Sequence, residues 1–335
     1  MGINITGGNK IMNENSNFLR PMSVGEILDN TFKIFGRNLL SILVFSAVIG
    51  GVFDIISGLI TYQMMPAPMS MANNSWIDLL ENPDIAPEIV PYDFGEYISQ
   101  FFAFQGVVIL LAIISGVFIQ PFVQGGIINI AYNDAKGQKL TIGQGLTATL
   151  KKLGKLILTS LSLIPYYIAV GIVLVIVAVI FLIPVILSGT VMSNDPTGGR
   201  IAGFIFMLFI AIVIMAALVI LSGLFISFTY HGAAIEDVCG FSAIGRSFKL
   251  VGKKFWRVLG VSLLIYLIVG IIVLLLTFIS GVTALVSPNR MLANFSIGFI
   301  ITAFVTPIIY IATTLLFLDI KARVEGTQEQ ELIIV

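Results

Sequence analysis

The chain has 335 residues, of which 57% are apolar and 11% are charged, and its 18 basic residues balance 18 acidic ones. In water-soluble globular proteins charged residues make up about a quarter of the chain. This composition excludes a soluble globule and indicates an all-α polytopic membrane protein. Residues 1–19, which are rich in Gly and Asn, are predicted to be a disordered tail.

Six apolar runs follow this tail, and each exceeds the ~20 residues that a helix needs to cross a ~30 Å hydrocarbon core. They are residues 39–62, 101–131, 156–187, 201–230, 258–286 and 297–320. The sequence therefore predicts six transmembrane helices within a membrane domain of residues 20–325. Several runs are long for one upright span, so we expect tilt, helical extensions into the cytosol, or breaks near Pro121, Pro165 and Pro184.

Three segments with one shared pattern each precede a pair of apolar runs. They are Ser23–Asn38, Thr141–Leu156 and Cys239–Lys254. The columns in register hold a basic residue, a glycine and a second basic residue: Lys33, Lys151 and Lys249, then Gly36, Gly154 and Gly252, then Arg37, Lys155 and Lys253. Three copies of one unit predict three repeats, each made of an interfacial helix plus two spans.

The first two segments have the features of an amphipathic helix in the headgroup layer. Ser23 and Glu26 form an S-x-x-E capping box, and Thr141 and Gln144 predict the same box in the second copy. Apolar side chains recur along one face of the first copy at Val24, Ile27, Leu28, Thr31, Phe32 and Phe35. The lysines would face anionic lipid, each worth ~1 kcal/mol near the surface. The glycine before the last basic residue suits a bend from the membrane plane into the span.

The distribution of charge predicts the orientation in the membrane. All basic residues except Arg200 and Arg290 lie before the first run, after the sixth, or in the connections that share their side. By the positive-inside rule, both termini of this cell-membrane protein are predicted to be cytoplasmic. The connection at residues 63–97 holds six acids and no Lys or Arg, so we expect it outside. Residues 326–335 are predicted to be a second cytoplasmic tail.

Asp54 is the only formally charged residue well inside a predicted span, where its insertion costs roughly 2.5–3.5 kcal/mol. A candidate intramembrane polar site comprises Asp54, Ser57, Gln105, Thr306 and Tyr310. One interpretation is an interior accessible to protons or a solute. The other is a protonated Asp54 that is hydrogen-bonded to a glutamine or tyrosine and so joins two helices.

The sequence contains no recognisable catalytic constellation, such as a P-loop, a G-x-S-x-G elbow or an H-E-x-x-H helix. No cofactor and no metal site are therefore predicted. His231, the only histidine, is expected in a capping or surface role at the end of the fourth run. We expect the protein not to be an enzyme.

Three motifs near the predicted cytoplasmic ends support a family resemblance. They are R-P-M-S-V-G-E-I-L-D from Arg20, a segment from Glu236 to Ser247, and D-I-K-A-R-V-E-G from Asp319. Over about residues 19–327 the chain resembles the membrane domain of some bacterial glycerophosphoryl diester phosphodiesterases. The matching charged residues map to the cytoplasmic rim, where they could pair and fasten the interfacial helices to the bundle: Glu26, Asp29, Glu236, Arg246, Asp319 and Arg323.

In the enzymes of that family, the resemblance places phosphodiesterase activity in a separate barrel with paired histidines and acidic metal ligands. A chain with one histidine cannot reproduce that site. We therefore expect a stand-alone membrane domain that anchors, assembles with or regulates another membrane component. The alternatives are a small transporter or permease subunit built around Asp54, and a lipid-handling protein. The expected partners are the lipid bilayer and a protein of unknown identity, and no nucleic acid is expected.

Overall fold

A computed structural model describes residues 20–66, 94–187, 198–286 and 298–333, and every regular element within these ranges is a helix. Six of the helical segments are long and apolar enough to cross a membrane, which confirms the predicted all-α multi-pass class. These segments are Leu39–Gln63, Gly95–Ala135, Ile142–Ile183, Ile205–Ile235, Phe255–Ile279 and Gly298–Gly326.

The helices of the described ranges differ greatly in length, and three stretches are π-helical. In chain order the elements are α2 (Val24–Arg37), α3 (Leu39–Leu43), η2 (Val44–Gly51), α4 (Val52–Gln63), α6 (Phe94–Ile114), η3 (Ser115–Ile119), α7 (Gln120–Ala135), α8 (Ile142–Leu187), α9 (Gly198–Ile226), α10 (Thr229–Ile235), α11 (Phe241–Lys253), α12 (Phe255–Val286), η4 (Ile301–Val305) and α14 (Thr306–Ile333).

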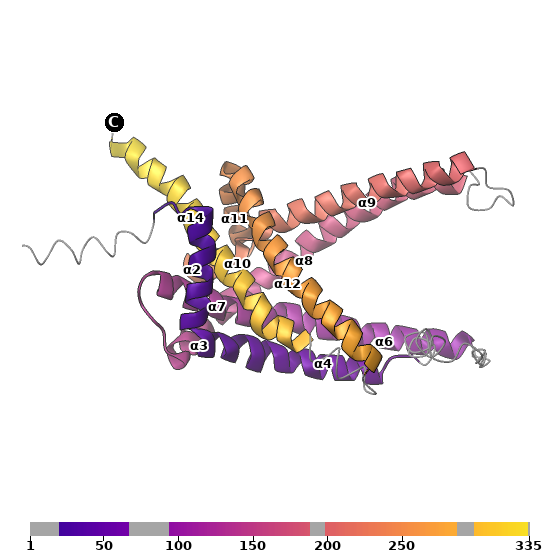
Figure 1. Cartoon of the computed structure of the whole chain (residues 1–335), viewed down its shortest axis with the longest axis horizontal. Coiled ribbons are helices and arrows are strands. Elements are labelled where there is room, and N and C mark those ends of the chain that lie inside the picture. The colour runs from indigo at the N-terminus through magenta and orange to yellow at the C-terminus, as the bar shows by residue number, and fades with distance from the viewer. Residues whose placement is uncertain (1–19, 67–93, 188–197, 287–297, 334–335) are drawn as a thin grey trace, which may run out of the picture. The chain divides into compact units, whose positions relative to one another are not determined.

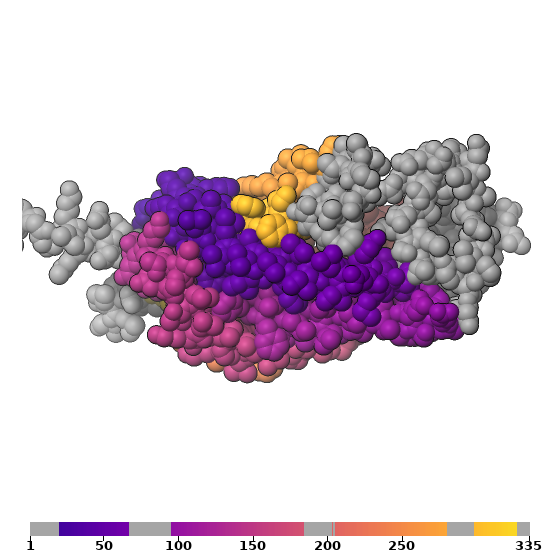
Figure 2. Space-filling view, turned by 90° about the horizontal axis from the view of Figure 1, so that it is seen from below, coloured from indigo at the N-terminus to yellow at the C-terminus, as the bar shows by residue number. Residues whose placement is uncertain are grey.

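The chain divides into two compact units. The first contains Met22–Leu153 and Leu263–Leu315, and the second contains Gly154–Ser262 and Leu316–Val335. In the first unit α3, η2 and α4 form one helical run beside α6, η3 and α7, and Figure 2 shows these two runs lying along each other. In the second unit α9 runs beside α8, as Figure 1 shows, and α11 packs on α9 and α10.

The predicted capping boxes are confirmed at the start of α2 and of α8. The backbone N–H of Ser23 donates to the Glu26 carboxylate at 2.6 Å, and the Glu26 N–H donates to the Ser23 hydroxyl at 3.2 Å. Thr141 and Gln144 make the same reciprocal pair at 3.0 and 3.3 Å. Each box satisfies two N–H groups that the first turn of a helix leaves without a partner.

Only two of the three predicted interfacial helices are separate from the span that follows. The backbone leaves the helical conformation at Asn38, between α2 and α3, and at Lys254, between α11 and α12. In contrast, α8 continues through Gly154, so the second predicted interfacial segment and its span form one unbroken helix. Glycine permits a bend but does not impose one. At the break, the Asn38 side chain donates from Nδ2 to the Ile34 carbonyl at 3.0 Å.

Equivalent columns of the three predicted copies have similar burial. Thr31, Thr149 and Ser247 are buried, whereas Phe32, Leu150 and Phe248 are exposed. The exposure of Phe32 corrects the predicted apolar face of α2, because Ile27, Thr31 and Ile34 are the buried positions of this helix. The shared burial agrees with a repeat, and the three-repeat architecture stays a prediction.

The long helices extend beyond the predicted runs instead of breaking at each proline. α8 continues through Pro165 and Pro184 without interruption. The π-helical stretches η3 and η4 each end two residues before a proline, Pro121 and Pro307 respectively. Proline lacks an N–H and clashes with the carbonyl four residues earlier, so a widened turn before it is one way to keep the helix continuous.

Two further segment boundaries differ from the prediction. α9 ends at Ile226, before the predicted limit of residue 230, and a turn at Ser227 and Phe228 leads into α10. α14 continues to Ile333, so the predicted C-terminal tail is helical up to that residue. The predicted N-terminal tail, residues 1–19, lies outside the described ranges, as does most of the predicted outer connection.

Candidate functional site

Asp54 lies in α4 of the first unit, and its partner is a threonine from the sixth span. The Thr302 hydroxyl donates to Asp54 Oδ2 at 2.7 Å, across 248 residues of sequence. The prediction named a glutamine or tyrosine as the partner, and this was wrong. Thr302 lies in η4, and Asp54 follows η2 by three residues, so the hydrogen bond joins two helices next to their π-helical stretches.

Small residues bring η2 and η4 close together beside this pair. The Ser46 hydroxyl, which is fully buried, donates to the Ala303 carbonyl at 2.9 Å. A Cβ added to Gly51 would lie 2.7 Å from the Phe299 ring, closer than two such atoms can approach. In a membrane, small residues and interhelical hydrogen bonds of this kind hold helices together.

Of the other predicted members of the intramembrane site, only Ser57 has a hydrogen bond to Asp54. The Ser57 hydroxyl donates to the Asp54 backbone carbonyl at 3.0 Å, one turn along the same helix. The Thr306 hydroxyl donates to the Ile301 carbonyl of its own span at 3.2 Å. Tyr310 bonds instead to Gln120, at 3.3 Å between the hydroxyl and Oε1. Gln105 lies half-buried in α6. Within the described ranges, therefore, Asp54 has a hydroxyl beside it and no second carboxylate or base.

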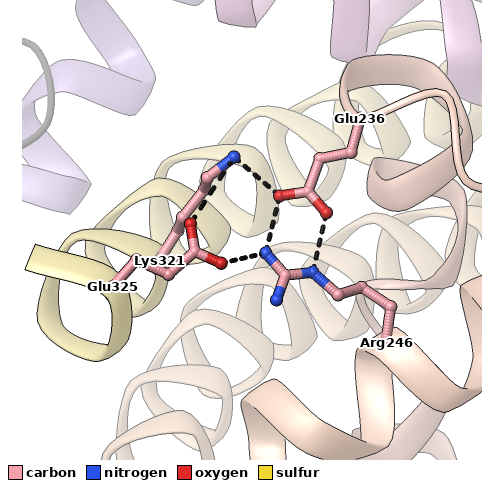
Figure 3. Close-up of polar contacts among 4 residues, drawn as sticks. All are labelled: Glu236, Arg246, Lys321 and Glu325. Carbon is pink, nitrogen blue, oxygen red and sulfur yellow. Dashed lines mark hydrogen bonds and ion pairs between the residues drawn. The ribbon is translucent and has the colours of Figure 1, made fainter. Parts of the chain in front are cut away.

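The predicted rim residues Glu236 and Arg246 form a charged cluster in the second unit (Figure 3). Arg246 donates from Nε and Nη2 to the two oxygens of Glu236, at 2.7 and 2.8 Å, and it also pairs with Glu325. Lys321 Nζ lies 2.7 Å from Glu236 Oε1. We name these four residues the rim cluster. It ties the end of α10 to α11 and α14, with the Arg246 and Glu236 side chains only 21% and 11% exposed.

The rim cluster changes the protonation of its members. Burial raises the pKa of Glu236, but hydrogen bonds from Arg246 and Lys321 and the charges of both outweigh this, so the pKa lies below its ordinary value of 4.5. The Glu236 carboxylate holds the pKa of Arg246 above its ordinary value despite partial burial. Both groups are therefore charged at neutral pH and form a true ion pair.

A second buried ion pair lies near the rim cluster on α14. Asp319 is fully buried, and its two oxygens accept hydrogen bonds from Arg257 Nε at 2.7 Å and Arg323 Nε at 2.8 Å. Two guanidinium groups offset the cost of burying this carboxylate. Asp319 and Arg323 were predicted rim residues, whereas Arg257 was not. It lies outside the motifs and is 62 residues from its partner.

The predicted rim residues of the first unit, Glu26 and Asp29, serve α2 itself. Glu26 completes the capping box, and Asp29 pairs with Lys33 one turn later. The long-range ion pair of this unit was missed: Arg37 pairs with Asp134, which also accepts from Asn38. The sequence held a signal for this pair. Asp134 follows the second apolar run and Arg37 precedes the first, so both are predicted at the same side of the membrane.

His231 is buried, contrary to its predicted capping or surface role. Its ring stacks on Phe317 with centroids 5.4 Å apart and meets Phe228 edge to face at 5.9 Å. No group of three or more His, Cys, Asp or Glu side chains in the described ranges could hold a metal ion. His231 therefore takes part in an aromatic core.

Comparison with family models, curated proteins and solved structures finds no match for this chain. The resemblance to the membrane domain of glycerophosphoryl diester phosphodiesterases therefore stays a prediction.

Proposed function

We propose that the chain is a non-enzymatic integral membrane protein that anchors, assembles with or regulates another membrane component. Its fold as a multi-pass helical protein is shown, and the membrane spans imply a lipid bilayer environment. We further propose that it lies in a cell membrane with both termini in the cytoplasm, and that it is a relative of the phosphodiesterase membrane domain.

The observation that carries this proposal is the use of charged side chains within the chain. Arg246, Glu236, Lys321 and Glu325 neutralise one another, and Asp319 is enclosed by two arginines. Catalytic and transport sites commonly direct titratable side chains at a substrate. The charged motif residues Glu236, Arg246 and Asp319 are instead engaged in ion pairs between helices, which is what a scaffold requires.

Purification from native membranes in mild detergent tests the proposal. The tagged protein is isolated beside a tagged, unrelated multi-pass protein, and co-purifying proteins are counted per copy of each. We expect one protein at a fixed ratio that the unrelated control lacks. Recovery of the chain alone, with intact fold by circular dichroism, would contradict an assembly role.

A transporter or permease subunit is the second candidate, and the Asp54–Thr302 pair favours it. This carboxylate is half-buried within a span, and π-helical stretches such as η2 and η4 are frequent at functional sites. For this candidate, Asp54→Asn abolishes transport and leaves the fold intact. For a scaffold, the same substitution leaves the partner ratio unchanged.

A further inference from the structure

One side of α11 and the start of α12 exposes aromatic and basic side chains together. Trp256 is 80% exposed and Phe241 is 69% exposed, and Phe248 is also exposed. Three exposed lysines lie among them, Lys249, Lys253 and Lys254. We name these six residues the aromatic–lysine face. Helical spacing places Phe241 and Phe248 on the same side of α11.

The opposite side of α11 fixes the orientation of this face. Ala243, Ser247, Leu250 and Val251 are buried. The Ser247 hydroxyl accepts from the Phe228 N–H at 3.1 Å and donates to the Phe225 carbonyl at 2.6 Å. These two bonds satisfy backbone groups where α9 ends and the turn to α10 begins, so α11 cannot rotate without breaking them.

Aromatic contacts place the face beside two membrane-spanning helices. The Phe248 ring stacks on Phe225 of α9, with centroids 4.9 Å apart, and meets Tyr166 of α8 edge to face at 6.1 Å. Phe255 stacks on Phe225 and contacts Trp256 at 5.3 Å. α11 therefore meets the apolar spans at Phe248. Trp and Tyr are enriched where the hydrocarbon of a membrane gives way to the headgroups.

Among the residues that the structure describes, no acid neutralises the lysines of the face. The sequence contains no Asp or Glu from Gly240 to Leu318. The nearby Arg246 and Arg257 pair with Glu236 and Asp319. Within the described part of the chain, no acid lies within ion-pair distance of Lys249, Lys253 or Lys254. The two arginines serve the fold, and the three lysines present their charge outward.

We propose that the aromatic–lysine face binds the phosphate groups of anionic glycerophospholipids in the adjoining headgroup layer. Each ammonium is a compact charge suited to a phosphate oxygen, and the Trp256 ring lies between the acyl chains and the headgroups. The inference goes beyond the anchoring role, because it names a ligand class and needs no protein partner. It predicts a local preference for anionic over zwitterionic lipid at α11.

Trp256 provides a local probe of this preference. The chain has two tryptophans, and the other is Trp76, which lies outside the described residues. The Trp76→Phe protein is reconstituted into vesicles of phosphatidylcholine with a minor fraction of phosphatidylglycerol. Bromine atoms on the acyl chains of one lipid or the other quench the fluorescence of Trp256 when that lipid is its neighbour.

We expect brominated phosphatidylglycerol to quench Trp256 several-fold more than its mole fraction predicts. Each lysine near an anionic surface raises the affinity for that surface about fivefold. The preference falls as salt is raised. It is lost in the Lys249→Gln, Lys253→Gln, Lys254→Gln variant and kept in the matched triple arginine variant. Lys33→Gln, which removes a basic residue from α2 instead of α11, leaves the lipid preference at Trp256 unchanged.

Two results would overturn the proposal. One is quenching that follows mole fraction in the protein with its lysines intact, at low salt. The other is a preference that survives the triple glutamine change in a protein whose circular dichroism is unaltered. If the triple glutamine variant does not fold, the salt series on the unsubstituted lysines decides, and a preference independent of salt counts against the lysines.

Discussion

α2 and α11 are two copies of one predicted sequence pattern, and they treat their charges differently. In α2, Lys33 pairs with Asp29 and Arg37 pairs with Asp134. In α11 the aligned residues are Lys249 and Lys253, which have no acid beside them in the described structure. The shared sequence pattern therefore predicts which positions of the two helices carry a basic side chain. Whether that side chain is available to a ligand depends on the acidic residues around it, which the pattern does not include.

A single aligned position, Asp29 in α2, accounts for the different surroundings of Lys33 and Lys249. The aligned residue in α11 is Gly245, which stands four residues before Lys249 as Asp29 stands four before Lys33. Gly245 is exposed, and a Cβ added there would meet nothing within 4 Å. One substitution in α11 can thus give Lys249 the acidic neighbour that Lys33 has, without a steric cost.

The largest expected effect contrasts the ion pairs of the two helices. Arg246→Ala leaves the buried Glu236 carboxylate with reduced compensation and should lower the free energy of unfolding by about 3 kcal/mol. Lys33→Ala removes a solvent-exposed pair and should cost roughly 0.5 kcal/mol or less. Unfolding in mixed detergent and dodecyl sulfate measures both. Equal losses for the two variants would contradict the difference in burial.

The second largest effect is expected from acid, which should reduce the contribution of the rim cluster to stability. Because the pKa of Glu236 is lower in the folded protein than its ordinary value of 4.5, its contribution to stability is fully present above pH 4.5. The contribution is lost as pH falls through the lowered pKa. Thermal unfolding of the wild type and of Glu236→Gln across this range checks the sign. The variant should show the smaller loss on acidification, and identical pH profiles would exclude Glu236 as the source.

Gly245→Asp should give Lys249 of α11 the acidic neighbour that Lys33 has in α2. The new carboxylate pairs with Lys249 at i,i+4 and repels phosphate, so the preference of the Trp256 site for phosphatidylglycerol should fall about fivefold. Gly245→Asn adds a side chain of similar size without charge and should keep the preference. Equal quenching profiles for the two variants would show that charge at this column has no effect.

The smallest effect is expected from the reverse change in α2. Asp29→Asn removes an exposed i,i+4 pair and should lower the free energy of unfolding by about 0.3–0.5 kcal/mol, a difference that salt abolishes. Unfolding at low and high salt measures it. A loss of several kcal/mol would mean that Asp29 has a buried role that its exposure does not indicate.

Local features of the fold could be predicted from the sequence. The spans follow from hydropathy, and the capping boxes at Ser23 and Thr141 follow from contacts within one turn. The side of α2 that packs inward was only partly predicted, because Phe32 is exposed and Ile34 is buried. In a membrane an apolar side chain can face lipid as readily as a neighbouring helix, so hydrophobicity alone does not identify the packed face.

Long-range partners could not be predicted. Thr302 reaches Asp54 because two helices far apart in sequence cross at small residues. His231 is buried because Phe228, three residues earlier, and the distant Phe317 of α14 enclose it, and the contact with Phe317 is not indicated by the sequence. Glu236 and Arg246 were both identified through a motif, but their partners Lys321 and Glu325 come from α14. Such choices depend on tertiary packing.

Proton flux through reconstituted vesicles tests most directly whether the polar groups of this chain tie helices together or move a solute. Wild type and Asp54→Asn are placed in vesicles with a pH-sensitive dye and an imposed proton gradient. A structural Asp54–Thr302 bond predicts that both proteins leak no faster than protein-free vesicles. A flux in the wild type that Asp54→Asn abolishes, with the fold unchanged, would contradict the scaffold role and establish transport.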